Sequence, residues 1–152
     1  MWHVDDCKIS RKDASVVTDT LNKLEKIFGK ETPITVTRGP IHDYLGMTFD
    51  YSVKEKVKFY MFDYIEQVLN EVDSTLMVGS SKTPAAAQLF SINDDRIKLS
   101  RKEADAFHRN VARLLFLSKR ARPDLQTAVA FLCTRVQSPD VDDNKKLGRV
   151  MR

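Results

Sequence analysis

The chain has 152 residues, 42% of them hydrophobic and 30% charged, and its formal net charge is +4 at pH 7. These values are typical of a soluble globular protein with one domain or two small subdomains. Two cysteines are too few for a disulfide framework, the N-terminus does not look like a signal peptide, and no apolar run approaches the ~20 residues of a membrane span, so we expect an intracellular, non-secreted protein with no membrane partner.

The charge is unevenly distributed along the sequence. Residues 1–100 hold 13 Lys and Arg against 15 Asp and Glu, whereas residues 101–152 hold 12 against 6. A basic C-terminal third suits a polyanionic partner. Solvated helix faces would explain the same charges equally well.

The first predicted element is a short β-hairpin. Strands over residues 2–4 and 7–10 flank Asp5 and Asp6, which interrupt the strand pattern. Two adjacent carboxylates at a tight turn can hold a hard divalent cation. An ordinary polar turn has the same composition, so both interpretations stay open.

An amphipathic helix is predicted next. Asp13 is a suitable N-cap, apolar residues follow at helical spacing, and Gly29 is a natural stop. Beyond the helix, Ile34 and Val36 alternate with threonines as in a strand, until Pro40 breaks the pattern.

A second hairpin and a second helix follow. Strand-forming residues fill 44–51 and 57–61, and the short polar segment between them predicts an antiparallel pair. Residues 63–72 have the spacing of an amphipathic helix. Residues 73–99 are rich in Ser, Thr, Pro and Ala, which favours a long surface connection without a core element and a subdomain boundary.

The last third is predicted to be helical. Ser100 and Glu103 have the spacing of a capping box, and a broad apolar face covers 106–117. Pro123 suits the first turn of another helix, and a third helix is predicted from Asn144. The expected fold class is therefore α+β, with antiparallel hairpins followed by a mainly helical region.

Four stretches in this order resemble the reverse transcriptase of copia-type LTR retrotransposons. Residues 3–6 (His-Val-Asp-Asp) are similar to the family's Tyr-Val-Asp-Asp polymerase motif, and residues 44–47 (Tyr-Leu-Gly-Met) resemble the Leu-Gly strand of its primer grip. Residues 59–69 resemble the step into the thumb. Residues 113–135 resemble the block that contains Arg-Pro-Asp, Ala-Val and a final Arg.

The sequence departs from this family at His3, where the family has Tyr, and at Ala121, where it has Thr. The resemblance implies a fragment: a partial palm at 1–62, a thumb-like helix and connection at 63–99, and a basic thumb or connection region at 100–152. The fingers, the third catalytic carboxylate and the ribonuclease H domain would lie outside the chain. We therefore expect no polymerase activity from this chain alone.

The resemblance also implies the chemistry and its partners. Asp5 and Asp6 would be catalytic residues and ligands of Mg²⁺, or Mn²⁺, in an intact RNA-directed DNA polymerase. The partners would be an RNA template, a DNA primer and the remainder of the polyprotein, in a cytoplasmic particle or the nucleus. The residues expected to contact nucleic acid are His3, Leu45, Gly46, Lys54, Lys56, Arg109, Arg113, Arg120 and Arg122.

Other interpretations stay open. A non-catalytic nucleic-acid-binding module or an inert relic would share this fold. The acidic pair also resembles the start of a receiver domain with Asp50 as phosphoacceptor, although hairpin-joined polar strands argue against its parallel sheet. Lys54 and Lys56 could equally be solvent-facing residues of an edge strand, and Arg122 could pair with Asp124.

Overall fold

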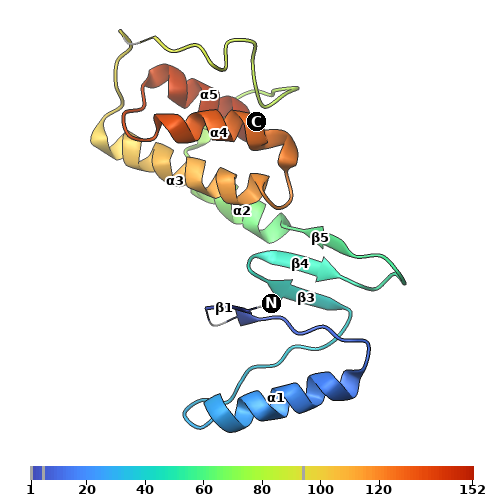
Figure 1. Cartoon of the computed structure of the whole chain (residues 1–152). Helices are drawn as coiled ribbons and strands as arrows, with labels where there is room; N and C mark the ends of the chain where they lie inside the picture. The colour runs from blue at the N-terminus through green and yellow to red at the C-terminus, as the bar shows by residue number, and fades with distance from the viewer. Residues whose placement is uncertain (1, 5, 94) are drawn as a thin grey trace. The chain divides into compact units, whose positions relative to one another are not determined.

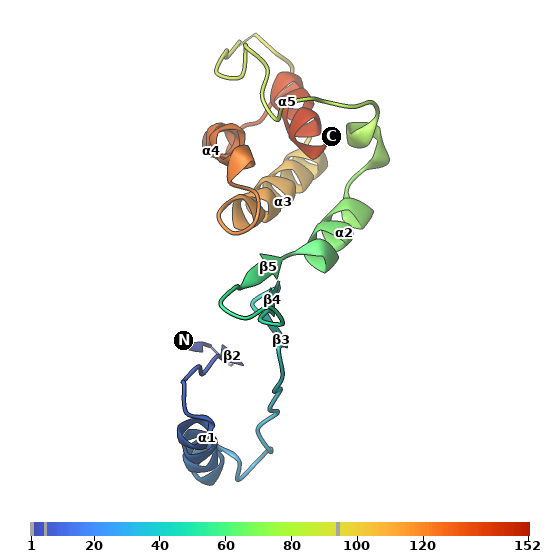
Figure 2. The same ribbon diagram turned by 90° about the vertical axis from the view of Figure 1, so that its right-hand side faces the viewer.

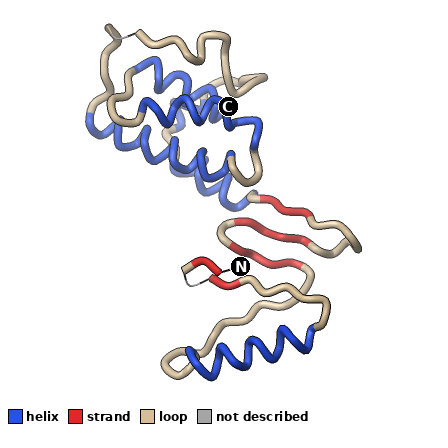
Figure 3. The backbone as a smooth tube through the Cα atoms, viewed as in Figure 1, coloured by secondary structure: helices blue, strands red, loops and turns tan. Residues whose placement is uncertain are grey.

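A computed structural model describes residues 2–4, 6–93 and 95–152 of the chain (Figures 1 and 3). All the named strands come before residue 61, and the named elements that follow are helices. The fold is of the α+β class, as predicted. Residues 1–60 form one unit with the strands and the first helix, and residues 61–152 form a second, helical unit. The second unit contains the segments 63–99 and 100–152.

The N-terminal hairpin of the first unit is shorter than predicted. β1 (Trp2–His3) pairs antiparallel with β2 (Asp6–Cys7). Asp6 thus belongs to a strand and not to the turn in which the sequence pattern placed it. The second strand ends at Cys7, before the predicted residues 8–10.

Helix α1 (Ala14–Phe28) has the predicted ends. The Asp13 carboxylate accepts a hydrogen bond of 2.8 Å from the backbone N–H of Ser15 and so caps the helix. Gly29 has an ordinary φ of −76°, but a Cβ at this position would lie 2.7 Å from the Glu25 carbonyl oxygen. Close approach, and not a left-handed backbone, therefore explains the glycine. No α1 residue is buried.

The strand predicted around Ile34 and Val36 is not formed, so that prediction was wrong. The Ile34 N–H donates to the Glu25 carboxylate at 3.0 Å, and the Arg38 guanidinium donates to the Thr18 hydroxyl at 3.1 Å. Polar groups of this segment thus bond to side chains of α1. Alternating Thr and β-branched residues favour extended backbone, but a ladder also needs a partner strand.

A three-stranded antiparallel sheet follows, in the order β3 (Ile41–Tyr44), β4 (Met47–Asp50) and β5 (Lys58–Tyr60). The β4–β5 pair confirms the predicted hairpin, whereas β3 was missed. Leu45 and Gly46, expected in a strand, form the β3–β4 turn with φ of 51° and 70°. Positive φ at both turn residues suits a two-residue hairpin, but leucine rarely adopts positive φ, so the residue types did not indicate this turn.

One face of this sheet is apolar. Tyr44 is buried, and the Phe49 and Phe59 rings meet across β4 and β5 with centroids 6.3 Å apart. The Lys8 ammonium lies 5.1 Å from the Phe49 ring centroid. This cation–π contact connects the segment after β2 to the sheet within the first unit.

The second unit begins with α2 (Phe62–Glu71), as predicted, and a short 3₁₀ helix, η1 (Ser74–Met77). The long connection up to residue 99 was expected to contribute nothing to the core, and that expectation was wrong. Leu89 is buried, and the Phe90 ring meets the Phe131 ring edge-on at 5.6 Å. The connection therefore packs against the helices that follow it.

Those helices are α3 (Arg101–Ser118), α4 (Gln126–Arg135) and α5 (Val141–Met151), with the 3₁₀ turn η2 (Pro123–Leu125) before α4. They pack against one another, as Figure 2 shows. Regular spacing turns one face of each helix inward. The most deeply buried apolar side chains are Phe107, Val111, Ala128, Val129, Leu132 and Leu147.

The helix starts differ in how well they were predicted. Ser100 and Glu103 form the expected capping box of α3. Helix α5 starts at Val141, three residues before the prediction, because Asp140 and Asp143 form a second capping box. Its N3 residue is aspartate instead of the more familiar Glu or Gln, so the pattern was overlooked.

Arg135 links α4 to this second capping box. Its Nε lies 3.0 Å from one Asp143 oxygen, and a terminal nitrogen lies 3.4 Å from Asp140. The two carboxylate side chains are only 2% and 3% exposed. Arg135 is therefore the partner of two buried carboxylates.

Within the described residues, no helix has the length and apolar character needed to cross a membrane. This finding agrees with the absence of an apolar run of that length in the sequence.

The two cysteines should differ in reactivity. Cys7 is exposed, whereas Cys133 is partly buried, and burial raises the pKa of its thiol because it disfavours the thiolate. Iodoacetamide at mildly alkaline pH should alkylate Cys7 several-fold faster than Cys133, as measured by peptide mass spectrometry. The difference should shrink in concentrated urea. Equal rates in the folded protein would contradict the prediction.

Candidate nucleic-acid interface

The acidic pair lies at the N-terminal hairpin. Asp6 is exposed and pairs across the strands with His3, which is also exposed, whereas Asp5 lies outside the described residues. No group of three or more His, Cys, Asp or Glu among the described residues could hold a metal ion. Asp6 supplies one exposed carboxylate, and Mg²⁺ in proteins is commonly held by one or two carboxylates together with substrate phosphates. The metal and catalytic roles of the pair stay predictions.

The predicted primer-grip residues lie at the two ends of β4. Leu45 and Gly46 form the turn before this strand, and Lys54 and Lys56 lie in the loop after it. Both lysines are exposed, and Glu55 between them has φ of 62°. The structure therefore does not bring the lysines together with the Leu-Gly turn.

The predicted arginines of α3 do come together. Arg109, Arg113, Phe116 and Arg120 follow one another at intervals of three and four residues, which places them along one side of the helix and its C-terminal turn. We call these four residues the α3 ridge. The Arg120 guanidinium stacks on the Phe116 ring at 3.6 Å and donates to the Phe116 carbonyl oxygen at 3.2 Å.

Helix α2 supports the α3 ridge from one side. The Tyr64 ring packs against Phe116 with centroids 5.1 Å apart, and its hydroxyl donates to the Arg113 carbonyl oxygen at 3.2 Å. Burial raises the pKa of Tyr64, so this hydroxyl keeps its proton at neutral pH. The Tyr64 ring therefore lies beside the stacked pair of Phe116 and Arg120.

Glu71 of α2 modifies the charge of the α3 ridge. It forms an ion pair with Arg113, and the hydrogen bond from Arg113 is the main reason that the pKa of Glu71 is lowered. Arg109 also lies close enough to lower this pKa further. The Arg113 charge is therefore partly balanced by a carboxylate, and Arg109 and Arg120 contribute most to the positive potential of the ridge.

Arg122 is engaged locally. Its Nε and a terminal nitrogen donate to the two Asp124 oxygens at 2.9 and 2.8 Å, in a bidentate pair. These hydrogen bonds lower the pKa of Asp124 and raise that of Arg122. The pairing that the sequence left open is thus confirmed, and Arg122 brings its own counter-charge.

Comparisons with models of protein families, with curated proteins and with solved structures found no match to the chain. The resemblance to copia-type reverse transcriptase rests on the four sequence stretches alone.

A second group of cations was missed by sequence reasoning. Lys145, Arg149 and Arg152 of the α5 region line a pocket together with Arg96 from the connection. The spacing of four and three residues along one helix face was the available signal. What the sequence could not indicate is that the connection folds back over this face.

Proposed function

We propose that the chain is part of a copia-type reverse transcriptase and that its helical unit contacts a template–primer duplex through the α3 ridge. The order of the four sequence stretches supports the family. The single observation that carries the nucleic-acid contact is the alignment of Arg109 and the stacked Arg120 along one side of α3. The net positive charge of residues 101–152 supports the same partner.

The chemistry of the ridge suits phosphate groups. A guanidinium presents several N–H donors in a planar fork, and a stacked guanidinium loses less freedom when it binds than a mobile one. Contacts to phosphates position a duplex without reading its sequence, as a polymerase needs when the duplex slides. Glu71 would repel a phosphate near Arg113, so we assign the main contacts to Arg109 and Arg120.

The remaining predicted residues belong to the same proposal. In an intact polymerase, Asp5 and Asp6 would help to hold Mg²⁺ or Mn²⁺, which stabilises the charge that develops during nucleotidyl transfer. His3, the Leu45–Gly46 turn and the lysines at 54 and 56 would lie near the primer. The remainder of the polyprotein would complete the enzyme, inside the cell, in a cytoplasmic particle or the nucleus.

A non-catalytic nucleic-acid-binding module would use the same α3 ridge and shares its test. The receiver-like alternative is disfavoured by strand pairing. Every named strand pair among the described residues is antiparallel, whereas a receiver is built on a parallel sheet. Asp50 lies in β4, and its carboxylate accepts a hydrogen bond of 2.8 Å from the Ser52 N–H.

The full chain should bind an RNA–DNA duplex. The logarithm of its binding constant should fall linearly with the logarithm of the salt concentration. The variant Arg120→Gln should weaken binding and lower the salt slope by about 1, because one phosphate contact is lost. Fluorescence anisotropy with a labelled duplex at several salt concentrations measures both quantities.

Arg122→Gln is the matched control. It also removes one positive charge, only two residues from Arg120, but the Arg122 side chain is already paired with Asp124. It should leave the salt slope unchanged. Absence of binding at low salt, a flat salt response, or a larger effect of Arg122→Gln than of Arg120→Gln would contradict the proposed interface.

A further inference from the structure

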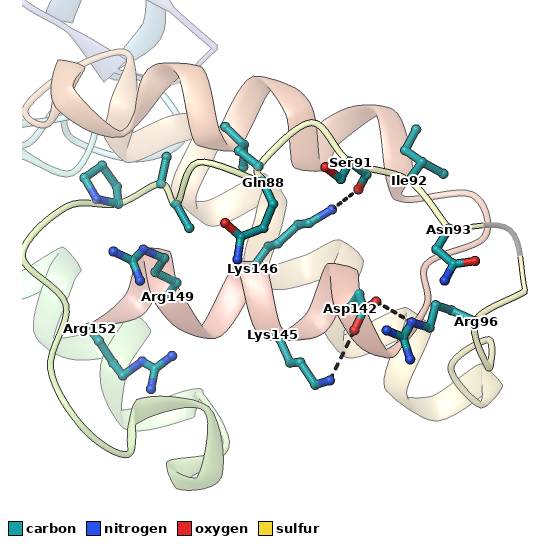
Figure 4. Close-up of a pocket in the computed structure, with 14 residues that line it drawn as sticks. Gln88, Ser91, Ile92, Asn93, Arg96, Asp142, Lys145, Lys146, Arg149 and Arg152 are labelled. Carbon is teal, nitrogen blue, oxygen red and sulfur yellow. Dashed lines mark hydrogen bonds and ion pairs between the residues drawn. The ribbon is translucent and has the colours of Figure 1, made fainter.

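A pocket of about 500 Å³ lies between α5 and the connection that precedes α3, within the helical unit (Figure 4). This volume is in the range of small-molecule sites. Its two walls differ in chemistry. The connection supplies a largely apolar wall that includes Pro84, Ala85, Ala86, Leu89 and Ile92.

The α5 wall is cationic. It supplies Lys145, Lys146, Arg149 and Arg152, and Arg96 of the connection is a fifth basic residue in the lining. Among the lining residues that the structure describes, Asp142 is the one with a carboxylate side chain, and it is shared between Arg96 at 2.6 Å and Lys145 at 3.1 Å. The described lining therefore has a net positive charge, which favours an anionic ligand.

The buried carboxylate behind this wall takes up only part of one charge. Asp143 lies 3.9 Å from the Lys146 ammonium and 3.0 Å from Arg135, which it shares with Asp140. Lys146 also donates to the Ser91 carbonyl oxygen at 2.6 Å, across the pocket from α5. This contact fixes the direction of the ammonium without cancelling its charge.

The arginines are oriented in the same way. Arg149 donates to the Thr83 carbonyl oxygen at 3.1 Å and to the Thr83 hydroxyl at 3.2 Å. The Arg152 Nε donates to the Gly148 carbonyl oxygen at 2.9 Å. The acceptors are neutral oxygens, which orient these guanidiniums without neutralising their positive charge. Because a guanidinium has five N–H donors and an ammonium three, donors remain for an anion.

We infer that this pocket binds a phosphate monoester, with the phosphate among the α5 cations and the organic part of the ligand against Leu89 and Ile92. A dianion suits several converging cations, and an apolar wall suits the group esterified to it. The monoester can come from a free nucleotide or from the 5′-phosphate of a nucleic-acid strand. The inference does not depend on the α3 ridge, none of whose residues lines the pocket.

Two substitutions in the full chain should change affinity in opposite directions. Lys145→Gln removes a cation whose side chain is 74% exposed, and it should weaken the binding of AMP by about threefold or more. Asp142→Asn removes the lining carboxylate and should strengthen AMP binding by a similar factor. Lys23→Gln, on exposed α1, removes one charge elsewhere and should leave the affinity unchanged.

Isothermal titration calorimetry at low salt with AMP and with adenosine measures these affinities, and thermal melting checks that each variant is folded. AMP should bind measurably and adenosine should not. Equal binding of the two ligands, no binding of AMP, or effects of Lys145→Gln and Asp142→Asn no larger than that of Lys23→Gln would overturn the inference. Any of these results would leave the duplex contact at the α3 ridge standing.

The source of the phosphate is distinguished by two versions of one short oligonucleotide, with a 5′-phosphate or a 5′-hydroxyl. If the 5′-phosphate strengthens binding and Lys145→Gln removes the gain, a strand terminus is the ligand. If AMP binds and the 5′-phosphate adds nothing, a free phosphate monoester is the ligand. Both outcomes support a phosphate site in this pocket.

Discussion

Replacement of Arg135 by alanine should lower the free energy of unfolding of the helical unit by about 3 kcal/mol. The substitution removes the main partner of two carboxylates, Asp140 and Asp143, whose side chains are only 3% and 2% exposed. A buried carboxylate without its cation retains most of its desolvation cost. The Lys98 ammonium lies 3.8 Å from Asp140, and the Lys146 ammonium lies 3.9 Å from Asp143. These two cations compensate in part for the loss of Arg135, so we expect a destabilisation at the lower end of the range for broken buried ion pairs.

Arg122→Ala is the control for this prediction, because it breaks a bidentate Arg–Asp pair of similar geometry whose side chains are 50% and 51% exposed. An exposed pair should contribute no more than about 1 kcal/mol. Urea unfolding followed by helical circular dichroism compares the two variants. If Arg135→Ala costs no more than Arg122→Ala, the buried carboxylates do not depend on Arg135 and the prediction is wrong.

Replacement of Phe107 by alanine should destabilise the same unit by about 3–5 kcal/mol. Phe107 is 1% exposed and lies on the inward face of α3, beside the position of Val111 one turn later. Removal of the ring loses its transfer free energy and leaves a cavity that the packed helices fill only in part. The variant should unfold at a clearly lower urea concentration than the parent protein.

Phe90→Ala provides the matched comparison for the core substitution. Phe90 is 64% exposed and makes an edge-on contact with Phe131, so its loss should cost about 1 kcal/mol or less. The same urea experiment measures both variants. Similar costs for Phe90→Ala and Phe107→Ala would show that the core does not lie where the helical faces place it.

Local patterns predicted the helices well because their signals are local. The caps at Asp13 and Ser100 and the apolar spacing of the helices are contained within a few residues each. The strands were predicted less well. Ile34 has strand-like neighbours but no partner strand, and the Leu45–Gly46 turn needs positive φ from a residue that seldom adopts it.

The candidate sites were harder to predict because they depend on contacts between distant residues. Arg113 and Glu71 form an ion pair across 42 positions, so the sequence could not show that part of the basic surface is balanced. Arg149 and Thr83 lie 66 positions apart, and their contact helps to form the cationic pocket. The sequence therefore shows which residues are charged, but it does not show which side chains contact one another in the fold.

The exposure of α1 has a thermodynamic consequence. Its 15 residues include none that is buried, so core burial contributes little to its formation. A helix of this length is marginal in water without tertiary support, and β-branched residues such as Val16 and Val17 lower its propensity further. We therefore expect helix α1 to unfold locally more readily than the buried helices. The caps at Asp13 and Gly29 determine where this helix begins and ends. They have less influence on the fraction of molecules in which the helix is formed.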